Sequence, residues 1–305
     1  MKINEIFING TKGSYLHVLS INVSNAKGNF HIIHGMGEHA KRYTDFAKFI
    51  AELGYNVYMH DHRGHGKSLK ANQSVGILEK EDTLFNMTKD ITKVKDYIDT
   101  QEKLPYYILG HSMGSIIVRY LLQNYPSINV KKAIIMGTLP KYPIIQVKAM
   151  RLLAVILGIF KPTNKPHQGL ASLLNQGLIK TVKNPKTPFD WLSYNEENVN
   201  TYINDPLSGY AYNKRFYQYL FKFIDVVNHK KSMSTIQSIP LLFIAGNDDP
   251  INNHLKSIEK LASYYQKINP SLPLKIIGIK HARHEILHED NRHESYEAIQ
   301  TFLAN

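Results

Sequence analysis

Short, almost wholly apolar runs alternate along the chain with longer segments of helical spacing. The runs that have the length and content of buried β-strands are residues 30–33, 56–59, 106–109, 133–136, 241–244 and 274–277. Segments such as 43–53 and 84–98 place apolar residues three and four positions apart, as an amphipathic helix does. Strands that are apolar on both faces indicate a mainly parallel sheet covered by helices on each side. The pattern therefore predicts an α/β fold.

Two stretches depart from this alternation. The first 22 residues alternate apolar and polar positions around a G-T-K-G turn, which predicts a β-hairpin. Residues 140–235 have helical character and many prolines but no strand pattern. We therefore predict that 140–235 is a helical cap, inserted into a core formed by 1–139 and 236–305.

Composition narrows the classes of protein that the chain can belong to. The chain is 43% hydrophobic, which is enough apolar content to form a buried core, and its 20% of charged residues is typical of a folded globular protein. It has no cysteine, which excludes disulfides and thiolate chemistry and fits a reducing compartment. The start lacks the pattern of a signal peptide, and the most apolar stretch, 152–160, is too short to span a bilayer. We expect a soluble, cytoplasmic protein.

The net charge is +12, which could favour nucleic acid, anionic lipid or acidic substrates. The Lys and Arg residues form no long run, and no nucleic-acid-binding motif is present. Charge that is spread in this way is typical of a solvated surface. We therefore predict no nucleic-acid partner.

A serine nucleophile is the first chemical feature that the sequence predicts. Residues 110–114 read G-H-S-M-G and match the G-x-S-x-G motif, with Ser112 at its centre. A strand at 106–109 precedes the motif, and a helix at 115–123 follows it. In that context a sharp strand-to-helix turn exposes the serine hydroxyl at the top of the sheet. The two glycines leave room for the turn and for close packing.

A serine hydroxyl needs a base, and the base needs an acid that orients it. In this type of fold the chain order is serine, then acid, then histidine. Two aspartates, Asp248 and Asp249, follow the next strand that ends in an acidic residue, and two histidines, His281 and His284, come after the last strand. The order is right for a triad with Ser112, and the residues alone leave both choices open.

An oxyanion hole needs two backbone N–H donors aimed at the developing negative charge. One is expected from Met113, which follows the nucleophile, and the other from Met36, within the H-G-M-G loop after an early strand. We expect His34 and Gly35 of that loop, and His111 beside the nucleophile, to contact the substrate.

A competing motif lies near the C-terminus, where residues 284–288 read H-E-I-L-H and fit the H-E-x-x-H signature of zinc proteases. Such enzymes need a third protein ligand downstream, and only 17 residues follow His288. The extended form of the motif requires glycine and histidine where this chain has Asn291 and Glu294. We therefore predict no metal site and no cofactor.

Several motifs together resemble the monoacylglycerol lipase and bacterial lysophospholipase branch of the α/β hydrolases. The resemblance runs from about residue 28 to the C-terminus, and its motifs occur in the family's order. They are H-G-M-G-E-H (34–39), D-H-R-G-H-G-K-S (61–68), G-H-S-M-G (110–114), the cap segments 187–199 and 205–209, G-N-D-D-P (246–250) and R-H-E-I-L-H-E (283–289).

The resemblance implies an α/β-hydrolase fold with a catalytic triad. It favours Asp249 over Asp248 as the acid and His284 over His281 as the base. It also implies that the histidine-rich segment 61–68 is a structural turn rather than a metal site. The implied substrate is an ester of a lipid with a single acyl chain, such as a monoacylglycerol or a lysophospholipid.

Three interpretations of the cap segment 143–160 remain open, because it is strongly apolar and carries a few cations. It could line an acyl tunnel, contact a membrane as a peripheral helix, or simply pack on the core. A serine aminopeptidase on the same fold is the alternative function, with Glu196, Glu197 and Asp205 available to hold a substrate amine. A non-catalytic binding protein is a third function, which the intact serine, aspartate and histidine argue against.

Overall fold

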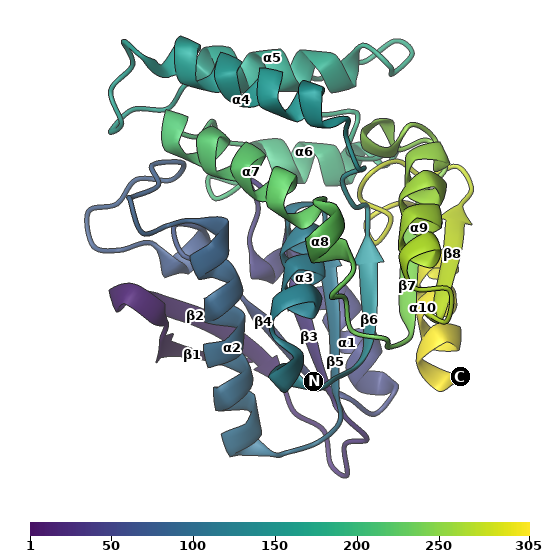
Figure 1. Ribbon diagram of the computed structural model, residues 1–305. Coiled ribbons are helices and arrows are strands. Elements are labelled where there is room, and N and C mark those ends of the chain that lie inside the picture. The colour runs from purple at the N-terminus through teal and green to yellow at the C-terminus, as the bar shows by residue number, and fades with distance from the viewer.

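A single eight-stranded sheet forms the centre of the computed structural model, which describes residues 1–305 (Figure 1). The strand order is β1-β2-β4-β3-β5-β6-β7-β8. Strand β2 is antiparallel to both of its neighbours, β1 and β4, and the six strands β3 to β8 are parallel to one another. The strands are β1 Asn4–Asn9, β2 Tyr15–Ile21, β3 Asn29–Ile33, β4 Asn56–His60, β5 Tyr106–His111, β6 Val130–Met136, β7 Leu241–Gly246 and β8 Leu274–Ile279. The predicted N-terminal hairpin, the six predicted strands and the mainly parallel sheet are confirmed.

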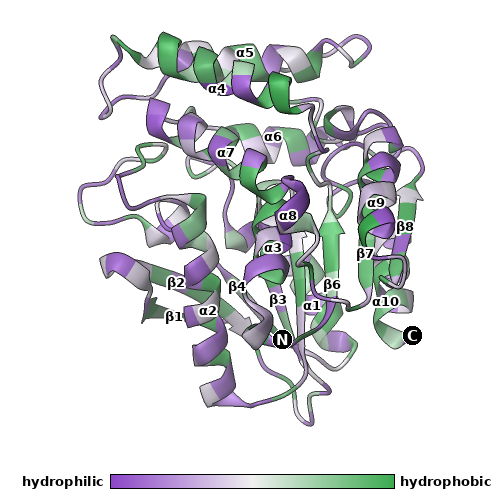
Figure 2. Ribbon diagram, viewed as in Figure 1, coloured by the Kyte–Doolittle hydropathy of each residue, from purple (hydrophilic) through white to green (hydrophobic).

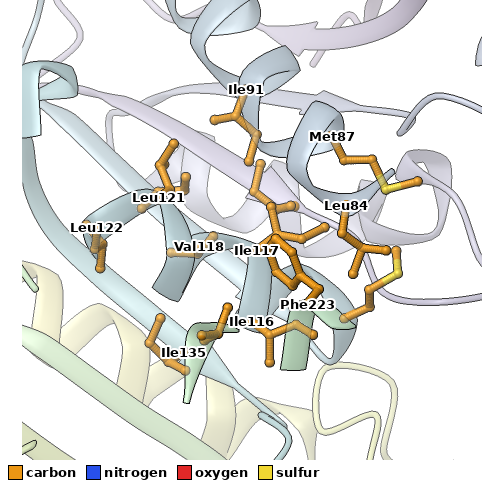
Figure 3. Packing of buried hydrophobic residues seen from close by; sticks show 14 of the residues in the cluster. Leu84, Met87, Ile91, Ile116, Ile117, Val118, Leu121, Leu122, Ile135 and Phe223 are labelled. Atoms are coloured by element: carbon orange, nitrogen blue, oxygen red, sulfur yellow. The ribbon is translucent and has the colours of Figure 1, made fainter. Parts of the chain in front are cut away.

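Helices cover both faces of the sheet because the central strands are apolar on both sides. One face packs against α2 (Leu84–Gln101), α3 (Met113–Asn124) and α9 (Lys256–Ile268), and the other against α1 (Thr44–Glu52) and α10 (Arg292–Ala304). Figure 3 shows part of the first layer, where side chains of α2 and α3 meet Ile135 of β6 and Phe223. Short 3₁₀ helices lie at Thr11–Gly13, Ala40–Tyr43, Gly66–Ser68, Pro126–Ile128 and Pro250–Asn252.

Between β6 and β7 the chain forms helices and no strand. These are α4 (Ile144–Gly158), α5 (Gln168–Ile179), α6 (Glu196–Asn204), α7 (Lys214–Val227) and the short α8 (Lys230–Met233). Figure 1 shows that α4 to α7, called the cap helices below, lie beyond the carboxyl ends of the strands, with α4 and α5 outermost. The boundaries at 140 and 235 stay a prediction. None of the helices has both the length and the apolar content needed to cross a membrane.

Candidate active site

Ser112 lies at a tight turn between β5 and α3. Its φ of 52° and ψ of −115° are sparsely populated for a residue other than glycine, and such a backbone costs about 1–3 kcal/mol. A Cβ on Gly110 would lie 2.5 Å from the carbonyl oxygen of Gly114, and one on Gly114 would lie 2.2 Å from that of Ile33. The sequence thus folds into the predicted turn because both flanking positions lack side chains.

A buried hydrogen bond joins His284 to Asp249. His284 lies in the loop between β8 and α10, and its Nδ1–H donates to Asp249 Oδ2 over 2.9 Å. Asp249 follows β7, and its carboxylate also accepts hydrogen bonds from the Ile251 amide (2.9 Å) and the Asn252 side chain (2.7 Å). The carboxylate is therefore held in place, and it fixes the imidazole with the proton on Nδ1. The other ring nitrogen is left to act as a base.

The neighbouring residues Asp248 and His281 form a different arrangement. Tyr194 donates its hydroxyl hydrogen to Asp248 (3.1 Å), and its ring stacks on His281 at a centroid distance of 4.5 Å. Arg283 covers the same ring, with its guanidinium carbon 3.8 Å from the centroid. Asp249 and His284 therefore meet, whereas Asp248 and His281 hold Tyr194. The catalytic roles of Asp249 and His284, which the resemblance favoured, stay a prediction.

The environment of His284 favours its protonated form. Burial alone would lower the pKa of His284, but the charge and hydrogen bond of Asp249 outweigh burial, so the pKa is raised above 6.5. An imidazole with a raised pKa is a stronger base once it is deprotonated. This arrangement suits a residue that must take a proton from a hydroxyl group near neutral pH.

The loop with Met36 faces Ser112. Its neighbouring amides are occupied, because Gly35 donates to Glu38 Oε1 (2.6 Å) and Gly37 donates to the Tyr212 hydroxyl (2.7 Å). The Met36 amide has no partner within the protein. On the other side of Ser112, Met113 supplies the first amide of α3, where helical amides lack internal partners. Both predicted oxyanion donors are thus available.

An apolar pocket of about 520 Å³ connects these residues to the cap helices. Of its 31 lining residues 20 are hydrophobic, and they include side chains of α4, α5 and α7. Ser112, His284, Met36, Met113 and His111 all contribute to its wall. The structure thus brings these five predicted residues together at one end of a pocket that the cap helices close.

Two predicted substrate contacts need correction. His34 is fully buried and, like Gly35, is not part of the pocket wall. His34 Nδ1–H instead donates to the Gly35 carbonyl (2.8 Å), and His34 Nε2 accepts the His62 amide hydrogen (2.9 Å). Both residues lie behind the Met36 loop and shape it, because the substrate side of the loop is formed by Met36 and Gly37.

A buried ion cluster beside the pocket was missed by sequence reasoning. Arg42 makes two hydrogen bonds to Glu285 (2.5 and 2.8 Å) and one to Glu38 (3.0 Å), and its guanidinium covers the Tyr202 ring. Although burial opposes ionisation, the charge of Arg42 lowers the pKa of Glu285 to about 2. Nothing in the sequence pairs Glu285 with Arg42, which lies 243 positions away.

Glu38, the second acid bonded to Arg42, lies between the Met36 loop and the next helix. It does not begin that helix, because the 3₁₀ helix begins at Ala40 and its N-cap is His39. The Glu38 carboxylate points back to the Gly35 amide and accepts the Tyr43 hydroxyl hydrogen (2.8 Å). It orders the Met36 loop directly.

The two histidines of the H-E-I-L-H motif have separate surroundings. His284 pairs with Asp249, whereas His288 lies against the Tyr43 ring, with centroids 6.0 Å apart. The motif lies in a loop that ends before α10, not on a helix. A zinc protease places both imidazoles on one helical face, so the arrangement differs from that of a zinc site.

Comparison with known proteins agrees with this description. The sheet, the tight strand-to-helix turn at Ser112 and the position of the cap helices define the α/β-hydrolase fold. A crystal structure of a thermostable carboxyl esterase from Bacillus coagulans, in complex with glycerol, superposes with a TM-score of 0.88 at 24% identity and covers 100% of this chain and 98% of that one. The predicted fold class is confirmed.

The chain belongs to the family described as "Serine aminopeptidase, S33", whose model matches residues 24–291. It is similar to the monoglyceride lipase homolog of monkeypox virus, at 24% identity over 90% of this chain and 88% of that protein. It is also similar to the probable lysophospholipase L2 of Haemophilus influenzae, at 24% identity over 89% of this chain and 82% of that protein. The resemblance read from the motifs is confirmed.

Proposed function

We propose that this carboxylic ester hydrolase cleaves lipid esters that carry a single acyl chain, such as monoacylglycerols or lysophospholipids. The apolar pocket that runs from Ser112 to the cap helices is the observation that carries the proposal. Its hydrophobic walls suit an alkyl chain, and its polar end holds the reactive groups. The relatives named monoglyceride lipase and lysophospholipase support the same substrate class.

In the proposed mechanism, Ser112 attacks the ester carbonyl carbon while His284 takes its proton. Asp249 keeps the proton on His284 Nδ1 and stabilises the imidazolium that forms. The amides of Met36 and Met113 donate to the carbonyl oxygen as it becomes negative. The tetrahedral intermediate then collapses, His284 returns the proton to the departing alcohol, and the acyl group stays on Ser112.

Water completes the reaction in a second, equivalent step. His284 takes a proton from the water molecule, whose oxygen attacks the acyl carbonyl carbon. The same two amides stabilise the second oxyanion. Collapse of this intermediate returns a proton to Ser112 and releases the fatty acid. No group other than those named has to change its bonding.

The geometry does not favour the aminopeptidase alternative. Glu196, Glu197 and Asp205, which could have held a substrate amine, do not line the pocket of Ser112. Glu196 pairs with Lys186 on the surface, and Asp205 with His39. The carboxylates of Glu38 and Glu285 do reach the pocket wall, but both are hydrogen-bonded to Arg42, a single cation that the two share. An ammonium group would find no unpaired carboxylate there.

We expect purified protein to hydrolyse a monoacylglycerol or a lysophospholipid at least about 10²-fold faster, by kcat/KM, than an aminoacyl amide. The ammonium group of an aminoacyl amide would lose its hydration in the pocket and find no unpaired carboxylate to replace it. A 10²-fold ratio of kcat/KM corresponds to a difference in activation free energy of only about 2.7 kcal/mol. Parallel assays of fatty acid and amine release measure the ratio. Preference for the aminoacyl amide would contradict the proposed function.

We also propose that the outermost cap helices contact a membrane that contains anionic lipid. From residue 141 to 186 the chain has eight Lys or Arg residues and no Asp or Glu. Figure 2 shows hydrophobic positions on α4 and α5, the helices farthest from the sheet. Ile145 is 78% exposed and Phe160 is 94% exposed. Three exposed residues recur every seven positions along α4 and its C-cap: Ile145, Leu152 and Ile159. Apolar side chains beside cations suit a negatively charged lipid surface.

The double variant Ile145→Glu/Phe160→Glu is expected to lose at least about tenfold in partitioning to vesicles that contain phosphatidylglycerol. Each apolar side chain contributes about 1.5–3 kcal/mol when it leaves water, so the loss of two exceeds a tenfold change. Co-sedimentation measures the partitioning. The matched control is Phe7→Glu, which replaces an exposed side chain on β1. Equal partitioning of the wild type and the double variant would contradict the membrane contact, and salt is expected to weaken binding of the wild type.

A further inference from the structure

The segment from Asp205 to Tyr212, between α6 and α7, is bonded to the loop that carries Met36. The Gly37 N–H donates to the Tyr212 hydroxyl (2.7 Å), and the Gly37 carbonyl accepts the Gly209 N–H (2.9 Å). A third contact joins His39 Nε2 to Asp205 Oδ2 at 2.7 Å. Both polar groups of the residue next to Met36 are therefore satisfied by the cap segment rather than by the loop itself.

The Tyr212 hydroxyl belongs to a directional chain of hydrogen bonds. Its oxygen accepts the Gly37 N–H, and its own proton goes to His65 Nε2, 2.7 Å away, because the neutral ring must use Nδ1 as the donor to the Arg63 carbonyl. His65 then carries its proton on Nδ1, which donates to the Arg63 carbonyl (3.0 Å). Burial, the largest cause, lowers the pKa of His65 to about 3, so the acceptor at Nε2 is present throughout the neutral range. Each bond in such a chain polarises the next.

The Tyr212 ring is itself fixed. It is 1% exposed and stacks on Phe216, the third residue of α7, with centroids 3.7 Å apart and planes 16° from parallel. The hydroxyl therefore cannot follow a loop that moves away from it. The Gly37 backbone, with its φ of +64°, would in contrast be free to turn if it were not held.

We propose that Tyr212 is a positioning residue for the oxyanion hole, which the cap thereby holds in its active geometry. It acts through Gly37: fixing that residue fixes the direction of the adjacent Met36 amide, the proposed oxyanion donor. The inference rests on the proposed function. The Tyr212 hydroxyl is already engaged within the protein, because its proton is given to His65 and its oxygen accepts from Gly37.

The test is Tyr212→Phe, which removes the hydroxyl and keeps the ring. We expect kcat on a soluble short-chain ester to fall by about 10- to 100-fold, less than the about 10²- to 10³-fold cost of deleting an oxyanion donor. KM is expected to stay within about twofold, because the substrate's ground state gains little from these amides. Affinity for an alkyl boronic acid, which forms a tetrahedral anion on serine, is expected to fall by the same factor as kcat.

The matched control is Tyr219→Phe, which removes a cap hydroxyl that donates to the Lys80 carbonyl, away from the Met36 loop. It is expected to match the wild type in kcat. If Tyr212→Phe does not fold, Gly209→Ala loosens the same clamp, since its Cβ would lie 3.1 Å from Tyr202 at a positive φ. That variant is expected to lower kcat in the same way.

Three results separate the two proposals. Unchanged kcat in Tyr212→Phe and in Gly209→Ala, in an enzyme that depends on Ser112, would overturn the positioning role alone. A raised KM at unchanged kcat would also overturn it, since the hydroxyl would then bind substrate. Ester hydrolysis by the wild type that persists in Ser112→Ala would instead overturn the proposed function itself.

Discussion

Ser112→Ala is expected to lower kcat for ester hydrolysis by about 10⁴- to 10⁶-fold, the largest effect of any substitution in this protein. Without the hydroxyl no acyl-enzyme forms, and only the oxyanion donors and the pocket are left to favour direct attack by water. The same variant is expected to lose all labelling by a serine-reactive fluorophosphonate. Mass analysis of the digested wild-type adduct is expected to place the label on the peptide that contains Ser112.

The control for this experiment is Ser263→Ala, which replaces an exposed serine on α9. It is expected to label and to turn over like the wild type. A fluorophosphonate adduct on another residue, or labelling that persists in Ser112→Ala, would mean that Ser112 is not the nucleophile. Its strained backbone would then lack an explanation in catalysis.

Asp249→Asn is expected to lower kcat by about 10⁴-fold while the protein stays folded. The substituted amide can present an N–H to His284 Nδ1, which favours the tautomer whose proton is on Nε2. A histidine in that tautomer cannot accept the Ser112 proton. The residual kcat of Asp249→Asn is measured by stopping the reaction after long incubation and quantifying the released fatty acid at several enzyme concentrations.

The dependence of activity on pH tests the same pair. Only neutral His284 can act as a base, and its pKa is raised above 6.5, chiefly because the charge of Asp249 outweighs burial. In the wild type kcat/KM is therefore expected to fall as the pH drops through a value above 6.5. In Asp249→Asn the anionic partner is gone and only the more weakly acting Glu285 and Glu38 still oppose burial, so the residual activity is expected to fall at a lower pH than in the wild type.

The neighbouring carboxylate provides a matched control. Asp248→Asn changes the same group one position away, where it accepts the Tyr194 hydroxyl hydrogen and lies 3.9 Å from His254 in a partly exposed setting. It is expected to retain kcat within about threefold and the wild-type pH profile, as surface substitutions away from a site usually have small effects. A large loss in Asp248→Asn together with a small one in Asp249→Asn would reverse the assignment of the acid.

Much of the fold was determined by local pattern. Apolar runs such as 106–109 form strands because they can bury both faces, and the glycines at 110 and 114 permit the turn at Ser112 that larger residues would block. The residue order Ser112, Asp249, His284 is also readable, because ligand sites in open α/β sheets lie beyond the carboxyl ends of the strands. These features depend on residues close in sequence, or on a rule of topology that holds for the whole fold class.

The residues alone left open which aspartate and which histidine pair, and although the family resemblance favoured one choice, only the tertiary structure shows which pair meets. Nothing local distinguishes Asp248 from Asp249, or His281 from His284, until the loops after β7 and β8 lie side by side and one pair meets at 2.9 Å. The role of His34 was misjudged for the same reason: its ring turns behind the loop to the Gly35 carbonyl, a direction that the sequence does not show.

The sequence by itself determined the sheet, the tight turn at the proposed nucleophile and the order of the proposed catalytic groups, because each follows from hydrophobic period, turn sterics or chain order. The tertiary structure alone decided the ion pair of Arg42 with Glu285 and the bond from Gly37 to Tyr212, which join residues 243 and 175 positions apart. Such contacts exist only after the chain has folded. The strength of these contacts depends on their burial from water and on the positions of the two partners, and neither can be read from a short stretch of sequence.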